Sequence, residues 1–274
     1  MNKKTFIMKH SIIFCLSLLI LLSGCSKTDI GLPGQGFSYP IKKSPFTRPK
    51  LTFKPVNTTA ESGKAILIDA SHDGGTWWYP QSEQTGFSSA NYHQGKNFAD
   101  YLRSLGYRVD ELPRGTLITN DILNKYVNVI RAVGFGSYSE NEIGAYQSFL
   151  NRSSSLLLIN DHLSNSVNDP ISVQLGLLFT GAYQGSITSF ATHPVTSGVS
   201  SFPFMVGSVI NGPVPSNVTI LGSLQVLVDG KNISAGVMGT VDNPNSRIFF
   251  IGDINGIETV QQPFTANLVN WLFR

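Results

Sequence analysis

The stretch "AILIDASHDGGTWWYPQ", residues 65–81, decides the predicted fold of this chain. Its apolar run from Ala65 to Ile68 stops at Asp69, which predicts a buried strand followed by a glycine-rich loop. Among the polar and aromatic side chains of the loop are Ser71, His72, Asp73, Trp77, Trp78 and Tyr79. Such a loop is typical of an active site, of a sugar-binding surface, or of a turn that only requires glycine, and these residues leave all three open.

Strand and helix patterns alternate over the next ninety or so residues. Apolar runs predict further strands at 107–112, 127–133 and 155–159. Helices are predicted at 90–105, from Thr119 onward, and at 139–150. The last of these begins with a capping box, because Ser139 is followed three residues later by Glu142. This alternation predicts an α/β domain with a mainly parallel sheet and helices on both faces.

The second half of the chain has a different pattern. Three strand-like runs are present, at 218–228, 234–241 and 247–251. The dipeptide Asp229-Gly230 between the first two predicts a β-hairpin. Residues 263–273 carry apolar side chains on one face of a helix. The predicted fold therefore closes with a C-terminal hairpin, a strand and an amphipathic helix.

The N-terminus has the pattern of a bacterial secretory signal over residues 1–24. Three lysines precede an apolar core at 11–22, which is shorter than the ~20 residues that a bilayer span requires. The core ends in Leu22-Ser23-Gly24-Cys25, which resembles a lipobox. That resemblance implies that Cys25 is the first residue of the mature chain and carries a lipid; an ordinary secretory signal is the alternative. We expect a cell-envelope location, anchored to the outer membrane on its periplasmic or surface side if the cell is Gram-negative.

Cysteine and charge exclude several classes of function. The other cysteine, Cys15, lies in the signal, so the mature chain has no thiol left for catalysis, a disulfide or a metal. Residues 26–60 hold six basic residues and one acidic residue, whereas residues 61–274 hold 11 basic and 16 acidic residues. The excess of positive charge therefore belongs to the signal and the tether. The folded domain has no basic character that would indicate nucleic-acid binding.

Residues 25–60 form a proline-rich basic tether, and residues 61–274 form one domain. The tether has five prolines and no helical periodicity, which predicts a semi-extended spacer. We interpret it as a solvated linker; contact of its basic side chains with anionic lipid headgroups is the alternative.

Four segments resemble the class I glutamine-amidotransferase-like superfamily, which has a flavodoxin-like α/β fold. They are "AILIDASHDGG", "NEIGAYQSFLNRSSSLLLINDH", "ATHPVTSGVSSF" and "RIFFIGDINGI…QPFTANLVNWLF". More narrowly, the chain resembles the non-catalytic branch that includes gliding-motility auxiliary and intraflagellar-transport proteins. Catalytic relatives place a cysteine at the turn that corresponds here to Asn160-Asp161-His162. The resemblance therefore implies the fold without the amidotransferase activity.

The loops that follow the parallel strands are expected to form one rim, where open α/β sheets bind their ligands. This topology brings together His72, Asp73, Asp161, His162 and Asp253. Imidazole and carboxylate groups suit a divalent metal, but no recognised metal spacing is present, so we predict neither a metal nor a cofactor. Catalysis by His72, Asp73, Asp161 and His162 as acids and bases is a second interpretation. Capping of loops and helices by the same side chains is the third.

The aromatic run after the first strand has two interpretations. Exposed aromatic side chains bind sugars and partner proteins. Alternatively, two of the three pack against the helix predicted from residue 90. As ligand-binding candidates we take Trp77, Trp78, Tyr79, Tyr138 and Asp253.

Two functions are consistent with these observations. The first is a non-enzymatic envelope lipoprotein, held to the membrane by lipidated Cys25, whose rim binds a protein, a glycan or a small ligand. The second is a hydrolase-like enzyme of carbohydrate or cell-wall metabolism that uses the histidines and aspartates of the rim. We favour the first, because the cysteine nucleophile of the superfamily is missing.

Overall fold

A computed structural model describes residues 64–73, 76–81, 86–133, 138–161, 169–210, 212–228 and 230–273. The predicted signal, Cys25, the tether and His162 lie outside these residues. Residues 43–226 and 232–274 belong to one compact unit, and the fold below is that of its described part. A second unit is described only at Leu227, Val228, Gly230 and Lys231.

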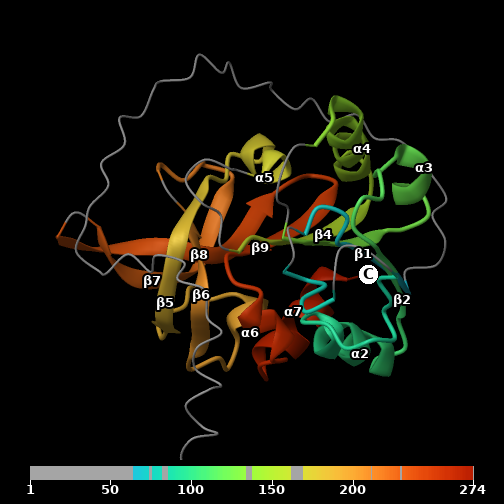
Figure 1. Cartoon of the computed structure of the whole chain (residues 1–274). Helices are drawn as coiled ribbons and strands as arrows, with labels where there is room; N and C mark the ends of the chain where they lie inside the picture. Colours follow the sequence, from blue (N-terminus) through green and yellow to red (C-terminus); the bar gives the residue numbers. More distant parts are fainter. Residues whose placement is uncertain are drawn as a thin grey trace, which may run out of the picture. The chain divides into compact units, whose positions relative to one another are not determined.

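A seven-stranded sheet with the order β2-β1-β3-β4-β9-β8-β7 forms the centre of the domain (Figure 1). Five of its strands are parallel: β1 (Ala65–Asp69), β2 (Arg108–Leu112), β3 (Asn128–Ala132), β4 (Ser154–Ile159) and β9 (Ser246–Ile251). Every residue of β1, β3 and β4 is buried. Parallel strands covered on both faces are mainly apolar, which explains why they could be predicted from the sequence.

The antiparallel part of the sheet is formed by β7 (Val218–Val228) and β8 (Lys231–Asp242). Strand β8 pairs antiparallel with β9, with Met238 opposite Ile251. Gly230, between β7 and β8, has a φ of 74°, a conformation that favours glycine. The predicted C-terminal hairpin and strand are confirmed.

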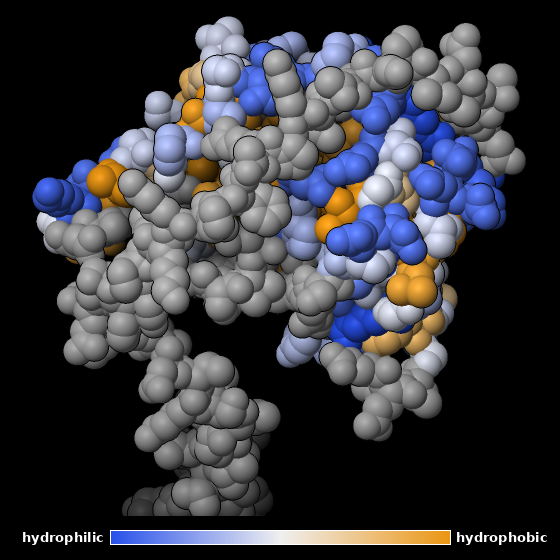
Figure 2. All heavy atoms as spheres, turned by 90° about the horizontal axis from the view of Figure 1, so that it is seen from above, coloured by the Kyte–Doolittle hydropathy of each residue, from blue (hydrophilic) through white to orange (hydrophobic). Residues whose placement is uncertain are grey.

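Helices cover both faces of the sheet, as predicted. Figure 1 shows α3 (Asn120–Leu123), α4 (Glu140–Leu150) and α5 (Pro170–Gln174) on one face. The other face carries α2 (Lys96–Ser104), α6 (Asn255–Glu258) and α7 (Phe264–Leu272). Figure 2 looks onto the side of α3 and α4, where hydrophilic side chains predominate. The capping box of Ser139 and Glu142 is present at the start of α4.

Two parts of the fold differ from the prediction. The helix expected from residue 90 begins at Lys96 instead, because residues 91–95 form a turn that packs against Trp77. The packing is so close that a Cβ on Gly95 would lie 2.2 Å from the indole ring. A separate two-stranded sheet of β5 (Phe179–Ile187) and β6 (Phe202–Ile210) was not predicted. Strand β5 contains two glycines and register shifts, which weaken the alternation that marks a strand.

Candidate functional site

The rim is defined here as the loops that follow β1, β3, β4 and β9. It brings His72, from the first loop, against Tyr138, from the second. Their rings are stacked, with centroids 3.9 Å apart and an interplanar angle of 28°. Residues distant in the sequence therefore meet at the rim, as the parallel topology requires.

His72 has a carboxylate partner that the sequence did not identify. Its Nε2 lies 2.9 Å from Oε1 of Glu142, and 19% of the His72 side chain is exposed. Glu142 also accepts hydrogen bonds from the Ser139 amide and hydroxyl and from the Ile118 amide. Burial by itself would raise the pKa of Glu142, but the hydrogen bonds from His72, Ser139 and Ile118 outweigh it and lower that pKa. The carboxylate is therefore ionised at neutral pH, and Nε2 of His72 donates to it.

Asp69, the last residue of β1, is the centre of a buried hydrogen-bond group below the rim. Its Oδ1 accepts bonds from the Ser71 amide at 3.0 Å and the Ser71 hydroxyl at 2.6 Å, and its Oδ2 accepts one from the Tyr146 hydroxyl. Burial, followed by the nearby charge of Asp69, raises the pKa of Tyr146 well above its usual value. The Ser71 hydroxyl is thus bound to a carboxylate and does not point to His72 as a nucleophile would.

Arg131, in β3, is fully buried beside this group and was not anticipated. Its Nη2 lies 2.6 Å from Oδ1 of Asp169, and the guanidinium lies 4.5 Å from the centroid of the Tyr138 ring. The contact with Asp169 has the distance of an ion pair without the angle of a hydrogen bond. Burial raises the pKa of Tyr138 well above its usual value, although Arg131 opposes that shift. Tyr138 therefore contacts His72 and Arg131 as a neutral ring.

The predicted acid–base role of Asp73 does not fit its surroundings. Its side chain is fully buried. One oxygen accepts a hydrogen bond from the Trp78 amide at 2.9 Å, and the other lies 2.5 Å from Nε of Arg114. Both oxygens thus hold the loop after β1 in shape, which is the capping interpretation.

Asp253 and Asp161 are also buried. The prediction that Asp253 binds a ligand does not fit its surroundings. Its Oδ2 accepts a bond from the Met205 amide at 2.6 Å and its Oδ1 one from the Asn255 amide at 2.8 Å, so it connects β6 to α6. A buried carboxylate bound to two backbone amides has no free face for a ligand.

The ligand-binding interpretation of Trp77 and Trp78 is corrected as well, because both indole rings are buried. Trp77 donates from Nε1 to Oε2 of Glu111 at 3.0 Å. The Trp78 ring centroid lies 4.8 Å from that of His93. The packing interpretation is therefore the one that the structure shows. Tyr79 differs from its neighbours, since 63% of it is exposed.

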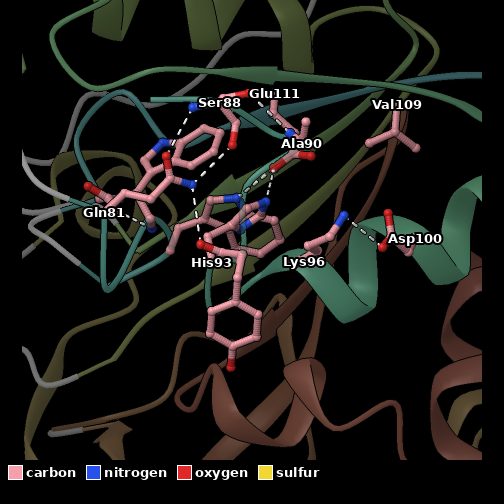
Figure 3. Close-up of polar contacts among 12 residues, drawn as sticks. Gln81, Ser88, Ala90, His93, Lys96, Asp100, Val109 and Glu111 are labelled. Atoms are coloured by element: carbon pink, nitrogen blue, oxygen red, sulfur yellow. Dashed lines mark hydrogen bonds and ion pairs between the residues drawn. The ribbon is translucent and has the colours of Figure 1, made fainter. Parts of the chain in front are cut away.

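A second buried polar cluster lies beneath this aromatic loop (Figure 3). Nε2 of His93 lies 3.3 Å from Oε2 of Glu111, and both side chains are fully buried. Arg103 donates from Nη2 to Oε1 of the same carboxylate at 2.7 Å. Burial, the largest effect, lowers the pKa of His93 although Glu111 opposes the shift. His93 is therefore neutral in the folded protein at pH 7.

We expect this buried histidine to make the fold sensitive to mild acid. Its pKa is about 6.5 in the unfolded chain and lower in the folded one. The unfolded state therefore binds more protons, and the free energy of unfolding falls as pH drops below about 6.5, by at most about 1.4 kcal/mol per pH unit for one proton. Denaturant unfolding at a series of pH values between the ordinary pKa values of glutamate and histidine measures this slope, that is, how the free energy of unfolding changes with pH.

The matched variants are His93→Gln and His193→Gln. Burial also lowers the pKa of His193, so each variant removes one titrating group. The His93→Gln variant should lose part of the slope and retain the part due to His193. An unchanged slope in His93→Gln would contradict the prediction.

Two further observations concern the described part of the chain. Within it, no three His, Cys, Asp or Glu side chains are grouped so that they could hold a metal ion. None of its helices is long and apolar enough to cross a membrane.

The fold is that of a flavodoxin-like α/β protein, and solved structures share it at low sequence identity. The N-terminal domain of mmIFT52 aligns with a TM-score of 0.54 at 11% identity over 75% of this chain and 94% of that chain. A thua-like protein from Bacteroides uniformis aligns with a TM-score of 0.50 at 15% identity, over 78% of this chain and 92% of that chain. A protein described as cytoplasmic, from Salmonella typhimurium, aligns with a TM-score of 0.51 at 15% identity, over 77% of this chain and 99% of that chain. No protein-family model and no curated protein matches the sequence. These likenesses show the glutamine amidotransferase-like fold and nothing about activity.

Proposed function

We propose that this protein is a non-enzymatic lipoprotein of the bacterial cell envelope that binds a partner protein beside the rim of its α/β domain. The observation that carries the proposal is an exposed tyrosine pair. Tyr79 is 63% exposed and Tyr92 is 64% exposed. We call these two residues the tyrosine pair.

Backbone and side-chain hydrogen bonds connect the segments that carry the tyrosine pair. The Gln94 amide donates to the Tyr79 carbonyl at 2.7 Å, so the two backbone segments lie side by side. Gln81 spans the same loop, because its amide group exchanges hydrogen bonds of 3.0 Å with the backbone of Ser88 (Figure 3). The buried indoles of Trp77 and Trp78 support the loop from below. Exposed aromatic side chains on a fixed backbone lose little entropy on binding.

The kind of ligand follows from the shape and chemistry of this surface. Arg114 lies 4.9 Å from the centroid of Phe87, whose ring packs on Trp78, and it also pairs with Asp73, so it supports the aromatic loop. Tyrosine is enriched among the residues that dominate protein–protein binding. These features favour a partner protein over a small ligand.

The buried state of the rim aspartates supports a binding role over catalysis. Asp73 and Asp253 each accept hydrogen bonds from backbone amides, and Ser71 is bound to Asp69. A catalytic acid or base must reach the proton that it transfers, and these groups bind the protein itself instead. The envelope location rests on the lipobox-like end of the signal at Cys25.

Photo-crosslinking in intact cells tests this proposal. A benzophenone amino acid at position 79 or 92 is expected to give a discrete crosslinked protein band. The matched control is the same amino acid at Leu117, which is 67% exposed and should give no such band. A Cys25→Ser variant should leave the membrane fraction and lose the adduct.

The outcomes separate the alternatives. An adduct that contains carbohydrate and no protein would make the tyrosine pair a glycan-binding surface. No adduct at either position, with the chain correctly folded and in the membrane fraction, would contradict the proposal.

A second candidate function rests on the His72–Glu142 pair. A partly exposed histidine oriented by an ionised carboxylate is the arrangement of a general base, which is the hydrolase-like alternative. If hydrolysis of a cell-wall polymer is detected, it should vanish in His72→Ala and persist when both residues of the tyrosine pair are changed to alanine. Binding of the partner protein should instead persist in His72→Ala and be lost when both residues of the tyrosine pair are changed to alanine.

A further inference from the structure

Two adjoining hollows lie away from the tyrosine pair. One, of about 670 Å³, is lined by residues of the segment 188–200, between β5 and β6. The other, of about 370 Å³, lies between the end of β5, the start of the same segment and the middle of β7. Thr188 and Ala191 line both hollows, so the two adjoin at these residues. We call the two together the 188–200 groove.

One wall of the groove is built by backbone contacts. Phe190 forms an antiparallel bridge with Gly222 of β7, and the Ala191 amide donates to the Leu221 carbonyl at 3.0 Å. A Cβ on Gly222 would lie 2.9 Å from Cγ of Met238, so the close packing of Met238 leaves little room for a side chain at this position. The chain after β5 is thereby fixed against the edge of the main sheet.

The other wall is held by η1 (Pro194–Thr196) and α7. His193 caps η1, since its Nδ1 accepts a hydrogen bond from the Val195 amide at 3.2 Å. Asn267 of α7 donates from Nδ2 to the carbonyls of Val195 at 3.3 Å and Ser197 at 2.7 Å. Both walls are therefore formed before any ligand arrives, which lowers the entropic cost of binding.

The lining of the groove is polar but uncharged. Among the described residues that line it there is no Asp, Glu, Lys or Arg. The hydroxyl and amide groups come from Gln184, Ser186, Thr188, Ser189, Ser223 and Gln225, among others. Burial lowers the pKa of His193, so it too is neutral at pH 7. Every one of these hydroxyl and amide side chains can both donate and accept hydrogen bonds.

This chemistry selects a class of ligand. Neutral hydroxyl groups of a sugar both donate and accept, and they match such a lining without requiring a counter-charge. Apolar atoms of Phe190, Pro194 and Leu224 also line the groove and suit the C–H faces of a sugar ring. An extended peptide would add along the edge of β7, but Phe190 already occupies that edge at Gly222. We propose that the 188–200 groove binds a neutral carbohydrate, independently of the tyrosine pair.

Calorimetric titration of the full chain, purified in detergent, tests this site. The probes are neutral oligosaccharides built from glucose, mannose, xylose and N-acetylglucosamine, and the anionic probe is oligogalacturonate. At least one neutral probe is expected to bind, and the anionic probe is not. Gln184→Ala combined with Gln225→Ala should weaken binding by about 10-fold or more, because two exposed hydrogen-bonding residues of the lining are lost.

Control variants locate the site. Ser189→Trp adds bulk at an exposed position and should abolish binding without loss of the fold, which the melting temperature reports. Gln262→Ala, an exposed glutamine outside the lining, should bind as the parent does. Three results would overturn the inference: no neutral probe binds, binding survives in both groove variants, or binding is lost when Tyr79 and Tyr92 are changed to alanine. Failure of the crosslinking test leaves this titration unaffected.

Discussion

Replacing Asp169 by alanine is expected to lower the free energy of unfolding by about 3–5 kcal/mol. The reason is Arg131, a fully buried guanidinium whose Nη2 lies 2.6 Å from the Asp169 carboxylate. Without that carboxylate a positive charge remains inside the protein with no opposite charge in contact. Asp169 also caps α5 by accepting bonds from the amides of Ile171 and Ser172, which adds about 1 kcal/mol. Denaturant unfolding of the full chain measures the loss.

Two variants separate the charge from the cap. Asp169→Asn keeps a capping oxygen and removes the charge, so it should retain the cap contribution and lose the ion pair. Arg131→Met combined with Asp169→Asn removes both charges and should recover much of the stability, since an apolar side chain tolerates burial. If Asp169→Ala costs less than about 1 kcal/mol, the ion pair does not stabilise the fold as argued here.

Local sequence was sufficient for the parallel sheet and for the start of α4. Strands β1, β3 and β4 are buried on both faces, and this leaves mainly apolar runs, interrupted in β3 by Arg131. The Ser139–Glu142 capping box depends on residues three positions apart. Both signals are short-range, which is why they could be recognised without a structure.

Pairings between distant residues could not be derived in the same way. Arg131 and Asp169 belong to different strand–loop units, and nothing local shows that a charged residue within an apolar strand will meet a carboxylate. Glu142 was recognised as a cap, yet its bond to His72 depends on how the loop after β1 turns towards α4. The topology placed the rim residues at one edge of the sheet. It did not reveal that Asp73 and Asp253 are already bound to backbone amides.

The aromatic run at 77–79 shows the same limit most clearly, because three neighbouring residues have two different environments. Trp77 and Trp78 are buried, and Tyr79 is exposed. Gly95 decides this arrangement, since only a residue without a side chain leaves room for the Trp77 ring at that point. The sequence contains that glycine but does not show which ring it accommodates.

Trp77→Ala is therefore expected to destabilise the fold by about 3–5 kcal/mol, the usual cost of removing a large buried ring. Besides leaving a cavity, the change deprives Oε2 of Glu111 of the indole N–H that donates to it at 3.0 Å. Tyr79→Ala should change the free energy of unfolding by less than about 0.5 kcal/mol, because that side chain is mostly exposed. Denaturant unfolding of the two variants gives the comparison directly.

The same two variants distinguish a structural residue from a binding residue at adjacent positions. Tyr79→Ala should weaken capture of the partner while the fold keeps its stability. Trp77→Ala should weaken capture only to the extent that it unfolds the chain, and lower temperature should restore binding as the fold recovers. If Trp77→Ala instead left stability unchanged and abolished capture, the indole would be a ligand contact. The buried packing against Gly95 and Glu111 would then not be the arrangement that the protein uses.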